Sequence, residues 1–252
     1  MTPAAPRPPR SRPSSRSCRN NVIADRLAAV RGRIASAARS AGRDPSSVRL
    51  VAVSKTFPVN LIRDAYAAGQ REFGENRVQE ALQKITQTTD LEIRWHLLGH
   101  LQTNKARKAG PAFATIQSVD SVELLQKLDR AAEEAGTKPE LLIQVDLARE
   151  ATKFGATPDE VPRLLEAAGA CRSARVTGLM TLPPVPDTPE DARPWFRTLR
   201  DLREGWLASG VPAGMLREMS MGMSGDFEVA IHEGATMVRV GTAIFGGRHV
   251  ED

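Results

Sequence analysis

The sequence predicts a single-domain α/β protein, a (β/α)8 or TIM barrel with one additional helix at its amino terminus. Three observations lead to this prediction. Short apolar runs alternate with helical patterns eight times from residue 48 onward. The runs are rich in Val, Ile and Leu, as strands buried on both faces should be. The alternation occupies the whole chain from residue 48, so we expect no second domain.

The region before the barrel divides into a tail and a helix. Residues 1–20 are rich in Pro, Arg and Ser and have no apolar period, so we expect them to be disordered. The same composition resembles a transit peptide, and a misassigned start codon would look alike; we interpret it as the tail of a cytoplasmic protein. From Ile23 to Ala41 apolar residues recur three or four apart, which predicts a helix that Gly42 ends. The folded domain then spans residues 21–252.

Two periodicities define the elements of the barrel. The apolar runs have strand length, and the segments between them repeat apolar residues at helical spacing. The longest helical pattern includes Phe196, Leu199, Leu202 and Trp206. The predicted strands span residues 48–54, 71–75, 93–98, 114–119, 141–145, 176–180, 218–220 and 236–240.

Composition excludes several classes of function. No stretch approaches 18 continuous apolar residues, so we expect no membrane span. The net charge is +5, but residues 1–20 contain five arginines and no acid. Removing those five from the 35 basic residues leaves 30, which equals the 30 acidic residues. The barrel is therefore neutral, and we expect no nucleic-acid partner. Cys18 and Cys171 form no CxxC pair, which favours a reducing compartment such as the cytoplasm.

Lys55 is the leading functional candidate. It ends the apolar run 48–55, and Pro58 then suits the first turn of a helix. The lysine therefore stands at the carboxyl end of a buried strand, where ligands bind in strand–helix alternating folds. A partly buried lysine there can lose its proton and attack a carbonyl. The alternative is an ammonium group that simply reaches solvent.

The other strands end on similar residues, which strengthens this interpretation. In such a barrel the carboxyl ends of the strands form the functional face. Most of the side chains predicted there are polar or glycine, although the strands themselves are apolar. They are Lys55, Asn76, His96 with Gly99, Ser118 with Asp120, Asp146, Met180 with Thr181, Ser220, and Arg239 with Gly241 and Thr242.

Two stretches have the composition of an anion-binding loop. Residues 220–226 follow the seventh strand, and residues 241–247, which begin with Gly241 and Thr242, follow the eighth. Glycine lets backbone N–H groups approach an oxyanion, and the loops after strands seven and eight commonly bind phosphate in this fold. For the first stretch, the alternative is a turn in which Ser224 only caps the next helix.

A lysine opposite a phosphate site suggests pyridoxal 5′-phosphate (PLP) as the ligand. Lys55 would form an imine with its aldehyde, and the two loops would hold its phosphate. Arg239, near the end of the eighth strand, is the candidate partner of the pyridine nitrogen. Because arginine stays charged and accepts no proton, it would leave that nitrogen unprotonated and the ring a poor electron sink. The alternative for Arg239 is a salt bridge in the barrel mouth.

Six motifs in order make the sequence resemble a known family, the YggS/PROSC-type pyridoxal-phosphate homeostasis proteins. The motifs are VAVSK at 51–55, FGEN at 73–76, WHLLGHLQ at 95–102, GLMT at 178–181, SMGMS at 220–224 and VRVGTAIFG at 238–246. Leu97 and Leu98 depart from the family, which usually has Phe or Met and then Ile, but the volumes are similar. The basic tail has no counterpart among the motifs.

The resemblance implies a fold, a cofactor and a set of contacts. It implies a single-domain barrel like the amino-terminal domain of alanine racemase, with Lys55 forming the internal aldimine (the Schiff base) and Asn76 near the cofactor ring. It also implies a carrier or regulator in PLP (vitamin B6) homeostasis, without established catalytic turnover. We expect a monomer that stores PLP or delivers it to apo forms of PLP-dependent enzymes. The residues implied around the phosphate are Ser220, Met223, Ser224, Gly241 and Thr242.

Two enzymatic functions are alternatives to a carrier. A PLP-dependent amino-acid racemase needs a second base opposite the lysine, commonly a tyrosine. The single tyrosine, Tyr66, falls in the helix after the first strand, away from the mouth. A metal-dependent hydrolase would need HxH or HExxH spacing, which His96, His100, His232 and His249 do not show. We therefore expect no catalytic residues and no metal, and interpret His96 and His100 as packing or hydrogen-bonding residues.

Overall fold

The computed structural model describes residues 15–148 and 154–247, with side chains from residue 22 onward. Eight parallel strands form a closed barrel in which each strand pairs with the next in sequence and the last pairs with the first. The predicted fold is confirmed, and every predicted strand end lies within one residue of the observed one. The strands are β1 Arg49–Val53, β2 Glu72–Glu75, β3 Arg94–Leu97, β4 Thr115–Val119, β5 Glu140–Gln144, β6 Arg175–Met180, β7 Glu218–Ser220 and β8 Met237–Val240.

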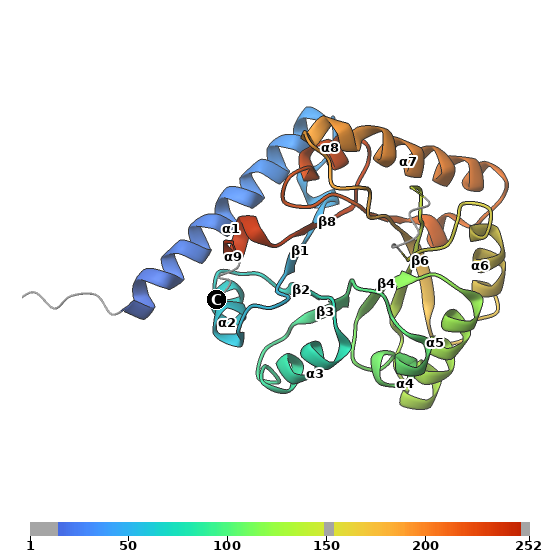
Figure 1. The fold of residues 1–252 in the computed structure, drawn as a ribbon, viewed down its shortest axis with the longest axis horizontal. Helices are drawn as coiled ribbons and strands as arrows, with labels where there is room; N and C mark the ends of the chain where they lie inside the picture. Colours follow the sequence, from blue (N-terminus) through green and yellow to red (C-terminus); the bar gives the residue numbers. More distant parts are fainter. Residues whose placement is uncertain (1–14, 149–153, 248–252) are drawn as a thin grey trace, which may run out of the picture.

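Helices surround the strands, with α1 along the outside of the ring (Figure 1). Short 3-10 turns join several elements: η1 Pro45–Ser47, η2 Thr103–Lys105, η3 Pro189–Ala192 and η4 Ala213–Leu216. Within the described ranges, no helix is long and apolar enough to cross a membrane. The α-helices are α1 Ser15–Ser40, α2 Val59–Ala67, α3 Val78–Thr86, α4 Ala106–Ala109, α5 Val122–Ala135, α6 Val161–Ala168, α7 Arg193–Ala208, α8 Phe227–His232 and α9 Thr242–Phe245.

Helix α1 is longer than the sequence predicted. It begins at Ser15 rather than near Ile23, so residues 15–20, which we assigned to a disordered tail, are helical. The segment from Ser15 to Arg31 contains no Pro or Gly, and its arginines have good helix propensity, so nothing stops the helix from extending. The remainder of the predicted tail, residues 1–14, lies outside the described residues.

The apolar face of α1 attaches it to the barrel. Leu27 and Val30 are buried, and the helix packs against α2, α8 and α9. These three helices flank the junction between β8 and β1, where the barrel closes (Figure 1). Fully burying an aliphatic side chain stabilises a fold by about 1.5–3 kcal/mol. The buried face of α1 therefore holds the helix across that junction.

A ring of ion pairs closes the amino-terminal end of the barrel, opposite the predicted site. Arginines and glutamates alternate around it and join β1, β2, β3, β5 and β7. Each member contacts the next at 2.9–3.8 Å, and the last contacts the first. We call this the floor ring: Arg49, Glu72, Arg94, Glu140, Arg217 and Glu218.

Candidate functional site

Lys55 lies in a tight turn at the carboxyl end of β1. The turn spans Ser54–Phe57 and is closed by the Phe57 N–H, which donates to the Ser54 carbonyl at 3.1 Å. Lys55 is half-buried, as the sequence predicted for a reactive lysine. The next residue, Thr56, has a φ of 67°, and it is the only non-glycine residue with positive φ in the described chain. A positive φ at this turn position favours Gly or Asn, so the backbone beside Lys55 is strained.

A buried ionic cluster beneath this turn was not predicted. Glu75, at the end of β2, accepts from the Ser54 hydroxyl at 2.6 Å and from Lys84 Nζ at 2.8 Å through the same oxygen, Oε1. Lys84 also donates to the Ser54 carbonyl at 2.8 Å and to Glu80 at 2.7 Å. Glu80 in turn accepts the Thr56 N–H at 2.6 Å. The chain segments on both sides of Lys55 are therefore bonded to one cluster.

The two acids of this cluster have opposite pKa shifts. Burial raises the pKa of Glu75, despite the hydrogen bonds from Lys84 and Ser54. Burial also disfavours ionised Glu80, but the hydrogen bonds from Lys84 and Thr56 outweigh it and lower the pKa of Glu80. Among the described residues, Glu75 Oε2 is a buried oxygen that lacks a hydrogen-bond partner.

Asn76 follows Glu75 directly and is half-buried at the same end of the barrel. Its position depends on Gly99 in the loop after β3. A Cβ on Gly99 would overlap the Asn76 carbonyl, so any larger residue there would displace the Asn76 backbone. The glycine that the sequence placed at a strand end therefore serves to let two mouth loops touch.

The loops after β7 and β8 meet, as an anion-binding site would require. The Gly241 N–H donates to the Ser224 hydroxyl at 3.2 Å. The alternative role for Ser224, capping the next helix, is wrong: α8 begins at Phe227 and its first residue is preceded by Asp226. Asp226 instead accepts the Met223 N–H at 2.6 Å, which folds the loop back on itself.

A short helix stands where the sequence indicated only a loop. Helix α9 starts at Thr242, immediately after Gly241. Thr242 is exposed, and the first N–H groups of a helix have no intrahelical acceptor. The structure thus brings together four of the residues predicted around a phosphate: Met223, Ser224, Gly241 and Thr242.

Ser220 belongs to a different group, with Arg239 in the barrel interior. Arg239 Nη1 donates to the Ser220 hydroxyl at 2.6 Å, and Nη2 donates to the Thr181 carbonyl at 2.8 Å. Burial lowers the pKa of Arg239 to about 10, with Asp226 opposing the shift, so the guanidinium stays charged at neutral pH. The salt-bridge alternative accounts only for the charge interaction with Asp226, because both hydrogen bonds go to neutral groups.

A line of hydrogen bonds runs from Arg239 toward the floor ring. The Ser220 hydroxyl donates to Gln117 Oε1 at 2.6 Å, and Gln117 Nε2 donates to His96 Nδ1 at 3.0 Å. His96 Nε2 then lies 3.3 Å from Glu72. Burial lowers the pKa of His96, although Glu72 opposes this, so the ring is neutral. The sequence analysis did not predict a role for Gln117. The signal that could have indicated one is that Gln117 is a polar residue within an apolar strand.

His100 and Tyr66 each have a structural partner. His100 lies 3.2 Å from Asp120 and stacks on Phe154 at 3.6 Å between ring centres, which agrees with a packing role. The Tyr66 hydroxyl accepts the Glu92 N–H at 3.3 Å just before β3, at the amino-terminal end of the barrel. Within residues 22–148 and 154–247, no group of side chains could hold a metal. His249 lies outside the described residues.

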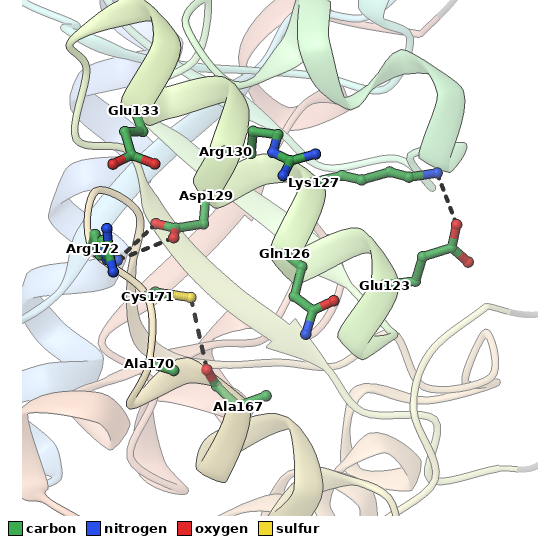
Figure 2. Close-up of a pocket in the computed structure, with 10 residues that line it drawn as sticks. All are labelled: Glu123, Gln126, Lys127, Asp129, Arg130, Glu133, Ala167, Ala170, Cys171 and Arg172. Carbon is green, nitrogen blue, oxygen red and sulfur yellow. Dashed lines mark hydrogen bonds and ion pairs between the residues drawn. The ribbon is translucent and has the colours of Figure 1, made fainter.

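One surface hollow lies away from the mouth. It measures about 510 Å³ and lies between α5 and the end of α6 (Figure 2). Asp129 accepts the Arg172 N–H there at 3.1 Å. Burial, with a contribution from Asp129, raises the pKa of the Cys171 thiol to about 11, so this cysteine is a poor nucleophile at neutral pH.

Comparison with known proteins identifies the family. The family description "Alanine racemase, N-terminal domain" matches residues 26–249. The chain is 42% identical over 224 residues to the pyridoxal phosphate homeostasis protein of Aquifex aeolicus, covering 89% of this chain and 97% of that one. It is 40% identical over 235 residues to the protein of the same name from Bos taurus, covering 88% and 86%.

Solved structures agree with this result. PipY of Synechococcus elongatus, solved without PLP and with PLP bound, is 44% identical, with TM-scores of 0.79 and 0.76. The match covers 89% of this chain and 100% of PipY. Alanine racemase of Clostridium difficile, at 16% identity and a TM-score of 0.69, covers 92% of this chain and 58% of the enzyme and shares the fold alone. The chain therefore belongs to the pyridoxal phosphate homeostasis proteins, a family built on the alanine racemase N-terminal barrel.

Proposed function

We propose that this protein binds PLP covalently through Lys55 and holds it for storage and delivery. The observation that carries the proposal is the half-buried Lys55, in a turn at the mouth of a barrel that is 44% identical to PipY, a protein solved with PLP bound. PLP supplies an aldehyde that a lysine amine can attack. The protein supplies the position of that amine.

The described residues fit such a ligand. Gly241, Thr242, Ser224 and Met223 lie together, and the first N–H groups of α9 are available to a phosphate. Arg239 offers only donors, which suits a ring nitrogen that keeps its lone pair. We propose that Ser220 acts mainly by orienting Arg239, because its hydroxyl already bonds to Arg239 and Gln117. Asn76 would lie beside the ring.

We further propose that the protein does not turn over amino acids. Arg239 stays protonated and cannot pass a proton to the ring nitrogen, so a carbanion would gain little from the ring. Tyr66 lies at the opposite end of the barrel from Lys55, so it cannot serve as the second base of a racemase. The relatives are named as homeostasis proteins rather than enzymes. The racemase alternative is therefore not favoured.

The first experiment tests covalent binding at Lys55. We expect the purified protein with PLP to show an imine absorption near roughly 420 nm that borohydride reduces to a stable adduct. Lys55→Ala should lose the adduct and remain folded, since Lys55 caps a strand and is not part of the packed core. Lys55→Ala with an undiminished reducible adduct would contradict the assignment and point to another lysine, such as Lys153, which lies outside the described residues.

The second experiment separates a carrier from an enzyme. The PLP-loaded protein is incubated with L- and D-amino acids in deuterated water, and exchange of the α-proton is followed. We expect none beyond stoichiometry, and transfer of PLP to an apo form of a PLP-dependent enzyme. Exchange over many turnovers that Lys55→Ala abolishes would restore the racemase reading. We place this function in the cytoplasm and in a monomer. Sedimentation of the full chain tests whether the protein is a monomer.

A further inference from the structure

The turn that contains Lys55 is held from both sides by residues outside it. Before Lys55, the Ser54 carbonyl accepts from Lys84 Nζ at 2.8 Å, and the Ser54 hydroxyl donates to Glu75 at 2.6 Å. After Lys55, the Thr56 N–H donates to Glu80 at 2.6 Å. Lys84 joins the two sides because it bonds both Glu75 and Glu80. We call Glu75, Glu80 and Lys84 the clamp.

The conformation that the clamp holds is an unfavourable one. Thr56 has a φ of 67°, and β-branched residues rarely adopt positive φ. Left-handed backbone is unfavourable for an L-residue, so the turn would relax without a compensating interaction. The bond from Thr56 N–H to the Glu80 carboxylate is charge-assisted and is of the size needed to offset that cost.

The clamp is also costly by itself. Glu75 has no exposed surface and the Lys84 side chain is 8% exposed. Burying charges is compensated only by good geometry and additional hydrogen bonds, and a hydrophobic replacement of a buried ion pair is often as stable. A purely structural need at the end of β2 would be met more simply by apolar residues. Unlike apolar residues, the charged residues Lys84 and Glu80 bond the backbone on each side of Lys55 and so fix it.

We infer that Glu80, supported by Lys84 and Glu75, is a positioning residue that fixes the direction of the Lys55 side chain toward the barrel mouth. Strain at functional sites persists only where surrounding structure imposes it. Here the surrounding structure acts on the two peptide units next to the lysine. The inference rests on the proposed covalent binding at Lys55. It adds that the reaction depends on Glu80, whose carboxylate bonds Thr56 and Lys84.

Three variants and one control test this role. Glu80→Ala removes the acceptor of the Thr56 N–H, whereas Glu80→Gln retains an oxygen acceptor and loses the charge. The third variant combines Glu80→Ala with Thr56→Asn. Asparagine tolerates positive φ better than threonine, so the turn no longer needs the clamp. The control is Glu123→Ala on α5. Glu123 and Lys127 form a Glu–Lys pair at 2.8 Å with the same four-residue spacing as Glu80 and Lys84, but this pair is exposed and far from Lys55.

Three measurements are made on each variant. The first is the rate of adduct formation at Lys55 with PLP, trapped by borohydride and located by mass spectrometry. The second is the affinity for pyridoxamine 5′-phosphate, which keeps the phosphate and ring but has an amine where PLP has the aldehyde. The third, in the cofactor-free protein, is hydrogen exchange of the Thr56 amide. Circular dichroism checks that each variant is folded.

For Glu80→Ala we expect adduct formation to slow by about tenfold or more, as loss of a charge-assisted hydrogen bond implies. Binding of pyridoxamine 5′-phosphate should change by less than about twofold, the Thr56 amide should exchange faster, and Thr56→Asn should restore most of the rate. Glu80→Gln should fall between wild type and Glu80→Ala. Glu123→Ala should behave as wild type.

The opposite results are equally clear. If Glu80→Ala forms the adduct as fast as Glu123→Ala, or loses both ligands equally, Glu80 is not a positioning residue. If Glu80→Ala does not fold, the same comparison on Glu80→Gln decides, and a wild-type rate there overturns the inference. If wild type itself forms no adduct at Lys55, the proposed function fails first, which distinguishes that failure from failure of the clamp alone.

Discussion

At the scale of single residues, hydrogen-bond partners separate side chains that their motif places together. Ser220 and Thr242 both belong to the stretches predicted to bind phosphate. Ser220 has no exposed surface and bonds to Arg239 and Gln117, whereas Thr242 is exposed at the first residue of α9. Two hydroxyls with the same predicted role therefore have different surroundings, and their substitutions should have different effects.

We predict that Thr242→Ala weakens PLP binding by about 1–3 kcal/mol and leaves binding of unphosphorylated pyridoxal unchanged, because only the phosphate would use this hydroxyl. Ser220→Ala should weaken both ligands, because it releases Arg239, which would face the ring. Titration of each variant with the two ligands measures the difference. Equal losses for both ligands in Thr242→Ala would remove its phosphate role.

Lys55 could be predicted from the sequence, whereas the clamp beneath it could not. Lys55 was found because a lysine at the end of an apolar run is conspicuous. The clamp was not found, because four of its five bonds join residues 9 to 30 positions apart. Periodicity reports which face of an element is apolar, but it does not report which charged residue on one element meets the backbone of another. Lys84 lay unnoticed within a segment predicted only as a helix.

At the scale of elements, periodicity predicted nearly everything about the strands. Buried parallel strands have a composition of their own, and each of the eight was placed within one residue. The misses were short pieces such as α9, which has four residues and no room for a helical period. The start of α1 was missed because a change in composition, not a helix breaker, was taken as its boundary.

The loop between β7 and α8 offers a prediction with an internal control. Gly222 has a φ of 92°, and a Cβ there would lie 2.6 Å from the Ala230 Cβ. Gly225, three residues later, has no atom within 4 Å of an added Cβ and no positive φ. Gly222→Ala should lower the free energy of unfolding by about 2 kcal/mol or more, and Gly225→Ala should change it by less than about 1 kcal/mol. Urea unfolding of both variants checks this, and equal effects would contradict it.

At the scale of the whole molecule, the barrel has the proposed PLP site at one end and a closed ion-pair ring at the other. The floor ring joins five of the eight strands, so its members should act on the stability of the entire barrel. Arg49 contacts Glu218 at 3.1 Å and Glu72 at 3.7 Å, with 28% of its side chain exposed. Its loss would leave two partly buried glutamates with one partner fewer.

We predict that Arg49→Met lowers the free energy of unfolding by about 1–3 kcal/mol, because partly buried charges lose a partner. Lys127→Met is the control: its pair with Glu123 is shorter, at 2.8 Å, but half of the lysine side chain is exposed. Exposed pairs contribute about 0–1 kcal/mol, so the control should change little. Burial rather than distance should decide the outcome, and a larger loss in Lys127→Met would refute that.

The line of hydrogen bonds through the barrel makes stability depend on pH. His96 has no exposed surface, and burial depresses its pKa from the ordinary 6.5. Below pH 6.5 the unfolded chain gains a proton at this residue that the folded barrel refuses, so stability that is fully present above pH 6.5 is lost as the pH falls toward the depressed pKa. Glu218, whose pKa is lowered, despite its burial, by the hydrogen bond from Thr236 and by Arg49 and Arg217, extends the loss below its ordinary 4.5.

The two groups are separable by substitution, because their pH windows differ. His96→Gln carries no titrating group, so the decline that begins below pH 6.5 should flatten, while the decline below pH 4.5 from Glu218 remains. The amide can still accept from Gln117, which limits the cost at neutral pH. Urea unfolding at a series of pH values measures both slopes. If wild type and His96→Gln decline in parallel from pH 6.5, then His96 takes up a proton in the folded barrel as readily as in the unfolded chain, and its neutral state inside the barrel is wrong.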